Sequence, residues 1–514
     1  MKSCTIISCL GFILFANFGF CGISLGPYLQ PTDDLESSVG IALRTENPAT
    51  AEIKYGLNSI NENSLTTTVT TTKHYIKLTG LAQGKRYLYQ IKADGDSSKV
   101  YSFKTSPSNG NFKLLIRADE HAMVDDKWTT RQWGIDTMIN FGTDIVISAG
   151  DVTDKSLPAE YEALLKTNQE LYATAIYCPT PGNHDGWGDS AYLDYFYLPE
   201  NGETGVKEQH YYFNYGNVLF ISVNDWAKSF PSSGWIGNII NQARSAGKAN
   251  FVVLFKHYQV FVNNDSDGDE TTITSDRKKD VVVGMCDLYD IDMVFSGHRH
   301  HYQRTYPVIQ DKSNTTQPKI VYSGKSSYDG SSKGTIYHEI NSTWYQFANP
   351  VPDPLFAANG IALTQNKSRV LGFTAVDVKG PVWEQNTLNY YWNTPDSFEN
   401  VDKFIYDKSA FTRAYIVSAN NSRVTWSFAN PLNFPMLIRY STESGIKENS
   451  VLNIYNCAGR IIKTFSNWKI TDHVTKEVFW DGMDKYGKFV QSGQYIFELQ
   501  MHGRVEVKRV ILLR

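Results

Sequence analysis

The spacing of apolar and polar positions divides the chain into three sections. The first section, residues 24–107, has short β-prone runs at 38–44, 51–55, 74–78 and 87–93. Turn-forming residues separate these runs, and no helical pattern lies between them. Strands at that spacing are typical of a small β-sandwich.

The middle section, residues 111–408, alternates two kinds of segment. Apolar runs that indicate buried strands lie at 114–118, 144–148, 175–178, 218–223, 251–255 and 293–295. Helical candidates lie between several of them, at 128–141, 156–171 and 275–289. This alternation predicts an α/β layered domain.

The last section, residues 430–514, returns to short strands separated by turns. We expect strands at 451–455, 461–465, 478–480, 495–499 and 505–513, and hence a second β-sandwich. The 514 residues exceed what one core usually holds, which agrees with a multidomain chain. A formal net charge of -4 gives no electrostatic basis for a nucleic-acid partner.

The N-terminus has the pattern of an export signal. Lys2 is followed by an uncharged, largely apolar stretch from Thr5 to Phe20, so we expect a signal peptide at 1–21 and a secreted, periplasmic or cell-surface protein. A retained membrane anchor is the alternative, because no charge occurs between Lys2 and Asp33; the apolar part falls short of the ~18–20 residues that a span needs. Beyond the signal, an odd number of cysteines remains, which argues against a disulfide framework: Cys178, Cys286 and Cys457.

Five short polar motifs in the middle section each follow an apolar run. They are Asp119-Glu120-His121, Gly150-Asp151, Gly182-Asn183-His184-Asp185, His257 and Gly297-His298-Arg299-His300. Open α/β sheets place their sites at the carboxyl ends of strands, and these motifs supply enough Asp, Asn and His donors for two adjacent metal ions. Such a pair can share a hydroxide and neutralise phosphate oxygens, which indicates phosphoester hydrolysis. Asp151 is the natural bridging carboxylate.

The ordered motifs resemble the calcineurin-like metallophosphoesterase superfamily. The stretches 213–225 and 297–307 are similar to purple acid phosphatases, and residues 26–30 and 78–87 resemble the fibronectin-like N-terminal domain of that family. The resemblance implies an αββα sandwich at 111–408 and a fibronectin III-like domain at 24–107. It implies a first metal held by Asp119, His121, Asp151 and His300, and a second held by Asp151, Asn183, His257 and His298.

The same resemblance suggests which residues face the substrate. Asn183 and His184 would contact it, and His184 would protonate the leaving oxygen. Asp185 could orient the His184 imidazole and raise its pKa; the alternative is a helix cap.

One position departs from purple acid phosphatases. Their colour comes from a tyrosine bound to ferric iron three residues after the Gly-Asp aspartate, and this chain has Asp154 there. His121 takes the place of that ligand, since purple phosphatases lack a histidine two residues after their first aspartate. We therefore expect a colourless enzyme, with metals among Fe, Zn and Mn that mixed N and O ligands do not discriminate.

The last section resembles the immunoglobulin-like domains of flagellar hook-capping proteins and of C-terminal secretion-sorting domains, through residues 453–456, 459–460, 480–482 and 492–495. That resemblance implies contact with a cell surface or a secretion machinery. It leaves open whether the domain is cleaved or retained.

Three further features lie outside the predicted ligand set. Arg304 either contacts substrate phosphate or forms a buried ion pair, and Asp225 is interpreted as structural. Residues 263–269 imitate the start of a calcium loop, but Thr274 replaces the bidentate glutamate, which favours a solvated acidic loop.

Three functions fit the sequence. A secreted phosphomonoesterase is favoured by the flanking motifs, and a phosphodiesterase or nucleotidase uses the same ligand set. A surface binding module with a vestigial site is the third. All but the last require a phosphate ester substrate.

Overall fold

The computed structural model describes Gly22 to Leu512 with internal gaps. The gaps are 125–128, 204, 207, 226–230, 261–278, 311–317, 331–333, 344–360, 365–369, 392–393, 410–412, 415–423, 430–435, 443–450, 457–458, 467–468, 471–474, 481–482, 489, 491–492 and 502–503. The predicted signal peptide, Cys457 and the acidic loop 263–269 therefore lie outside the described residues. No helix within the described residues is long and apolar enough to cross a membrane.

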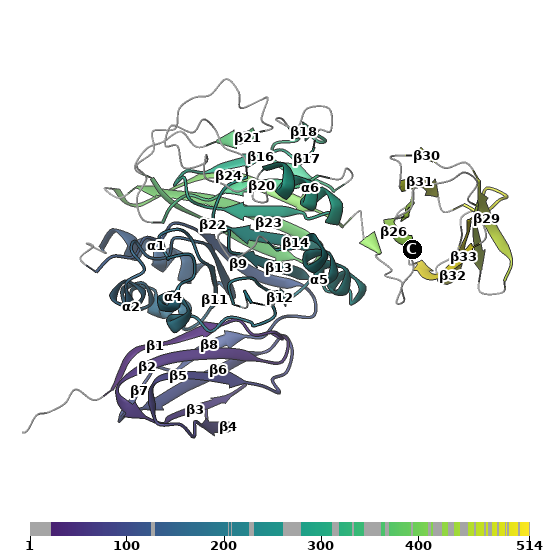
Figure 1. Cartoon of the computed structure of the whole chain (residues 1–514). Helices are drawn as coiled ribbons and strands as arrows, with labels where there is room; N and C mark the ends of the chain where they lie inside the picture. Colours follow the sequence, from purple (N-terminus) through teal and green to yellow (C-terminus); the bar gives the residue numbers. More distant parts are fainter. Residues whose placement is uncertain are drawn as a thin grey trace, which may run out of the picture.

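The N-terminal section is a β-sandwich (Figure 1). One sheet has the order β1 (Ile23–Gln30), β2 (Val39–Ala49), β5 (Thr71–Leu78). The other joins β4 (Asn63–Thr66), β3 (Ala51–Gly56), β6 (Arg86–Ala93), β7 (Asp96–Ser97) and β8 (Tyr101–Lys104). Alternate residues of β6 are buried, including Tyr89 and Ile91, as expected for a strand with one face on a core. The fibronectin-like assignment stays a prediction.

Two seven-stranded sheets form the central section. The first has the order β11 (Ile176–Thr180), β10 (Ile145–Ala149), β9 (Asn111–Arg117), β22 (Val370–Lys379), β23 (Val382–Tyr391), β24 (Thr394–Asp407), β19 (Ser327–Tyr328). The second has the order β12 (Tyr211–Tyr215), β13 (Val218–Val223), β14 (Phe251–Lys256), β15 (Met293–Ser296), β20 (Ile336–Glu339), β16 (Gln303–Thr305), β21 (Ile361–Thr364). A small hairpin joins β17 (Val308–Gln310) and β18 (Pro318–Ile320).

The buried residues show how these layers stack. On β14, Val253 belongs to the core shared with the first sheet, whereas Val252 and Leu254 belong to a second core. That second core is completed by α5 (Ser233–Ser245) and α6 (Lys279–Tyr289). The outer side of the first sheet carries α1 (Thr129–Asn140), α2 (Pro158–Thr167), α3 (Gln169–Tyr172) and α4 (Ser190–Tyr195) (Figure 1). The predicted layered domain is therefore two sheets between helices.

Three elements of the structure differ from those predicted. The helix expected at 156–171 is divided into α2 and α3 at Asn168, whose side-chain amide donates to the Leu164 carbonyl and so competes with the backbone. Helix α5 was not predicted, although Ile236, Ile239 and Ile240 have helical spacing. The long β22–β23 hairpin was also missed.

The C-terminal section has two sheets. One has the order β25 (Arg413–Ala414), β26 (Val424–Ala429), β27 (Met436–Thr442), β31 (Thr475–Trp480), β30 (Lys469–Ile470). The other has the order β29 (Ile461–Phe465), β28 (Val451–Asn456), β32 (Gly493–Met501), β33 (Arg504–Leu512). Because β26 pairs with β27, this sheet begins upstream of the expected residue 430.

Candidate metal centre

The polar motifs lie at the carboxyl ends of strands in the two seven-stranded sheets. Strand β10 is parallel to both β9 and β11, and β14 is parallel to both β13 and β15. Seven predicted ligands follow the carboxyl ends of five of these strands: Asp119 and His121 after β9, Asp151 after β10, Asn183 after β11, His257 after β14, and His298 and His300 after β15.

The first group consists of Asp119, His121 and His300, whose ligand atoms all lie within 4.8 Å of one another. His121 Nε2 and His300 Nε2 are 3.1 Å apart, and His300 Nε2 is 3.5 Å from Asp119 Oδ1. Two imidazole nitrogens that point at each other share one proton or a cation, so this pair fits a metal ligand set.

The second group consists of Asp151, His257 and His298, again within 4.8 Å. His257 Nε2 lies 3.1 Å from Asp151 Oδ2 and 2.9 Å from Asn183 Oδ1. Its other nitrogen, Nδ1, lies 2.9 Å from the Ala149 carbonyl oxygen. A donated bond at Nδ1 leaves Nε2 as the ligand atom, the usual arrangement for a metal-bound histidine.

Asp151 lies between the two groups. Its Oδ2 atom is 3.1 Å from His257 Nε2 and 3.7 Å from His121 Nε2. This is the position that a bridging carboxylate requires.

Glycines give the carboxylates the space they occupy. A Cβ atom on Gly182 would lie 2.2 Å from Asp151 Oδ1, and one on Gly297 would lie 2.5 Å from Asp119 Oδ2. Any larger residue at either position would displace a carboxylate. The two groups of N and O donors, with Asp151 between them, fit two metal ions.

The charges of the site are strongly coupled. Burial opposes ionisation of Asp151, but His257 and His121 outweigh it and hold the pKa of Asp151 well below its usual range. Burial lowers and Asp151 raises the pKa of His257, and the balance brings it to about 9. Burial and the nearby His257 lower the pKa of His298 to about 3.

The ligand backbones are strained. Ten non-glycine residues of the described chain have positive φ, and five of these are predicted ligands: Asp119, His121, Asp151, His298 and His300. Such conformations cost free energy and concentrate at functional sites.

His184 lies at the open side of the site, with its side chain 40% exposed. Its backbone N–H donates to Asp151 Oδ1 at 2.8 Å, and its Nδ1 is 2.6 Å from the Asp154 carbonyl oxygen. The Asp154 carboxylate, at Oδ1, is 3.4 Å from His121 Nδ1. Asp154 therefore contacts both His184 and a ligand of the first group.

The expected contact between Asp185 and His184 is wrong. The Asp185 carboxylate accepts hydrogen bonds from the backbone N–H groups of Val152, Thr153 and Gly182 and from the Thr153 hydroxyl. Asp185 thus joins the loop after β10 to the loop after β11, and the Asp154 carbonyl makes the orienting contact. Asp185 is not a helix cap either; Asp189 caps α4.

The contacts of Arg304 and Asp225 show that both residues are structural. Arg304 is 1% exposed and forms an ion pair with Asp402, Nε to Oδ2 at 2.6 Å, which supports the buried ion pair. Asp225 accepts from the Tyr258 N–H and pairs with Lys256, each at 2.7 Å, which supports the structural interpretation of this residue too.

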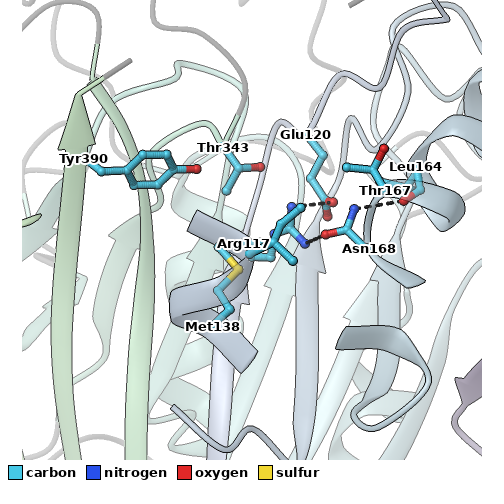
Figure 2. A pocket seen from close by; sticks show the side chains of 9 residues that line it. Arg117, Glu120, Met138, Leu164, Thr167, Asn168, Thr343 and Tyr390 are labelled. Carbon is cyan, nitrogen blue, oxygen red and sulfur yellow. Dashed lines mark hydrogen bonds and ion pairs between the residues drawn. The ribbon is translucent and has the colours of Figure 1, made fainter. Parts of the chain in front are cut away.

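A buried ion pair behind the first group was not predicted. Glu120, between the ligands Asp119 and His121, is 3.0 Å from Arg117. Arg117 also donates to Asn168 (Figure 2), and Tyr172 and Tyr177 donate to the Glu120 carboxylate. The adjoining cavity of about 10 Å³ has roughly the room of one water molecule and cannot hold a substrate. We infer that the pair fixes the backbone that carries both ligands.

Comparisons with known proteins agree with this geometry. The family model of calcineurin-like phosphoesterases matches residues 112–302. A purple acid phosphatase from yellow lupin seeds has a similar structure, with a TM-score of 0.58 and 16% identity over 74% of each chain. The central domain has the metallophosphoesterase fold. A structure titled PhoD is also similar, with a TM-score of 0.56 and 13% identity over 76% of this chain and 91% of that one.

Curated relatives match about half of this chain or less. An uncharacterised protein of Mycobacterium tuberculosis is 24% identical over 303 residues, 51% of this chain and 56% of that protein. Purple acid phosphatase 21 of Arabidopsis thaliana is 21% identical over 266 residues, 49% and 57% of the two chains. A third, from the same plant, is named "Probable inactive purple acid phosphatase 24"; it is 25% identical over 212 residues, 38% and 33% of the two chains. The chain spans about half the length, or less, of these relatives.

Proposed function

We propose that this protein is a secreted phosphomonoesterase with two metal ions and His184 as its general acid. The position of the Asp151 carboxylate between the two histidine groups carries the proposal. Bound metal ions would supply a hydroxide nucleophile and neutralise the phosphate charge.

The chain's own residues supply the rest of the reaction. Asn183, with its side-chain oxygen 2.9 Å from His257 Nε2, would orient the phosphate at the second group. The Asp154 carbonyl fixes His184 through Nδ1, which leaves Nε2 to carry the proton for the leaving oxygen. An alkoxide is a poor leaving group at neutral pH, so this proton lowers the barrier most for alkyl esters.

The proposal has a direct test. The protein lacking its first 21 residues is analysed for bound metal and assayed with a phosphomonoester, a phosphodiester and a nucleotide. We expect two metals per chain and higher turnover with the monoester than with the diester. A protein that binds two metals and hydrolyses no phosphoester would instead favour the binding module.

A phosphodiesterase or nucleotidase is the second candidate. A Hordeum vulgare protein named nucleotide pyrophosphatase/phosphodiesterase is 22% identical over 213 residues, 38% of this chain and 55% of that protein. The same assay separates the two, since preferred turnover of the diester would replace the first proposal by the second.

Export and surface contact belong to the proposal as well. The apolar stretch from Thr5 to Phe20 after Lys2 supports secretion. Fractionation of the producing cells, with N-terminal sequencing of the exported protein, would test it; a cytoplasmic protein that retains Lys2 would refute export.

A further inference from the structure

Two aromatic side chains border the second group of ligands. The Trp187 and Tyr258 rings are 5.2 Å apart, and each is half-buried. Trp187 lies 6.3 Å from the His257 ring, and Tyr258 lies 4.4 Å from the His298 ring. The first group has polar neighbours instead, with His184 and Asp154 against His121. The two halves of the site therefore differ in chemistry.

The backbone of Trp187 is held in an unfavourable conformation. Gly186, Trp187 and Gly188 have φ values of 57°, 58° and 76°, a region that a bulky side chain rarely adopts. Trp187 N–H donates to the Gly182 carbonyl at 3.2 Å, and Asn224 Nδ2 donates to the Trp187 carbonyl at 2.7 Å. Strain that surrounding bonds maintain beside a reactive centre indicates a functional side chain.

The backbone of Tyr258 is held by Asp225, the residue that follows Asn224 in the chain. Asp225 accepts from the Tyr258 N–H at 2.7 Å and pairs with Lys256, which also donates to the Tyr258 carbonyl. Asn224 and Asp225 directly follow β13. One turn thus anchors both aromatic residues.

We propose that Trp187 and Tyr258 form a stacking surface that selects phosphate esters whose organic group carries a planar ring. Aromatic side chains stack on nucleobases and other flat rings. A ring on a fixed backbone loses little conformational entropy when it binds. The Gly182–Gly188 segment carries both His184 and Trp187, so one loop holds the proposed proton donor and one ring of the stacking surface. This inference rests on the proposed phosphoesterase function.

Matched substrates test the surface. Adenosine 5′-monophosphate and ribose 5-phosphate both release the primary 5-hydroxyl of a ribose, and only the first carries a base. We compare their kcat/KM values in the metal-loaded wild type, Trp187→Gly, Trp187→Phe and Tyr258→Ala. Glycine accepts the positive φ of position 187, so Trp187→Gly removes the ring without adding backbone strain. Tyr486→Ala, 77% exposed in the C-terminal domain, is the control.

We expect the wild type and Tyr486→Ala to prefer the nucleotide. Loss of the Trp187 ring should lower the ratio of the two kcat/KM values by roughly 5- to 150-fold, mainly through KM, and Trp187→Phe should keep most of it. Tyr258→Ala should also lower the ratio of the nucleotide kcat/KM to the ribose 5-phosphate kcat/KM. An equal loss on both substrates, or no loss on either, would overturn the proposal.

Two further measurements complete the test. The pair 2-phenylethyl phosphate and n-hexyl phosphate compares a plain aryl ring with an alkyl chain. A preference for the phenyl ester that is lost in Trp187→Gly supports stacking on any planar ring. Adenosine binding by calorimetry requires no turnover: binding to the wild type and its loss in Trp187→Gly supports the surface even if the phosphoesterase proposal fails. Equal adenosine affinity of the two proteins contradicts it even if phosphate esters are hydrolysed.

Discussion

Replacing Asp185 by alanine should destabilise the central domain more than most single substitutions do. The carboxylate is fully buried and accepts from three backbone N–H groups, those of Val152, Thr153 and Gly182, at 2.8–3.0 Å. Each buried donor that loses its acceptor costs about 1–3 kcal/mol. Three such donors give about 4 kcal/mol, allowing for partial relaxation, and the two loops that carry Asp151 and His184 would separate.

Urea unfolding of the metal-free protein, followed at the central-domain transition, measures this loss. Asp189→Ala is the matched control, because Asp189 is an exposed helix cap. Its carboxylate accepts from the Ala191 and Tyr192 N–H groups of α4, which is worth about 1 kcal/mol. If Asp185→Ala lost no more free energy of unfolding than Asp189→Ala, the inference that Asp185 joins the two loops would be wrong.

The free energy of unfolding that Asp185→Ala loses should also depend on pH. Burial, followed by the charge of Asp151, raises the pKa of Asp185 to about 7, against about 3.9 in an unfolded chain. A group whose folded pKa is raised stabilises the fold fully below the unfolded value and loses that contribution as pH rises through the folded value. The difference between wild type and Asp185→Ala should therefore be larger at pH 4 than at pH 8.

Three other substitutions or titrations test the site. His184→Ala should lower kcat on an alkyl phosphate by about 10²–10⁴-fold and affect 4-nitrophenyl phosphate less; an unchanged alkyl kcat would exclude the general acid. Because the pKa of His257 is raised to about 9, metal binding at pH 7.5 should release its proton, so the calorimetric binding enthalpy should vary with the ionisation enthalpy of the buffer; an enthalpy that does not vary would refute this. Glu120→Gln should cost about 3–5 kcal/mol by leaving the Arg117 charge buried, as measured by urea unfolding, and should weaken metal binding; a stability equal to that of the wild type would show that the ion pair is dispensable.

Much of the centre could be predicted because it depends on strand ends. A ligand such as Asp151 or His257 directly follows an apolar run, and parallel strands bring those ends to one edge. The spacing of one residue between Asp119 and His121 was also informative. Motif and strand together therefore located the predicted ligands without the structure.

Contacts between loops could not be predicted in the same way. Asp185 follows His184 in sequence, but its carboxylate turns to the backbone of Val152 and Thr153. Adjacency in the chain suggested the wrong partner, since neighbouring side chains diverge when the loop bends. The Arg117–Glu120 pair needs Asn168 from the α2–α3 break and Tyr172 from α3, and the sequence pattern did not reveal that break.

Element prediction failed where the signals conflicted. Helix α5 contains Gly234 and Gly237, which lower helix propensity although its isoleucines have the right spacing. The hairpin of β22 and β23 has a turn at Gly380, with φ of 58°, between two long strands that carry polar residues. Those polar residues, such as Thr374 and Thr387, bond to each other in the core.

The strained backbones of the predicted ligands imply a trade-off between the metal centre and the stability of the fold. At Asp119, His121 and Asp151, asparagine or glycine would suit the observed positive φ better than the resident side chain does. An asparagine that keeps the acceptor oxygen of Asp119 or Asp151 but weakens metal binding would therefore relieve backbone strain rather than damage the fold. Descendants of this scaffold could lose their chemistry and keep their shape, and a phosphatase-like domain with altered ligands would remain available as a stable protein for other uses.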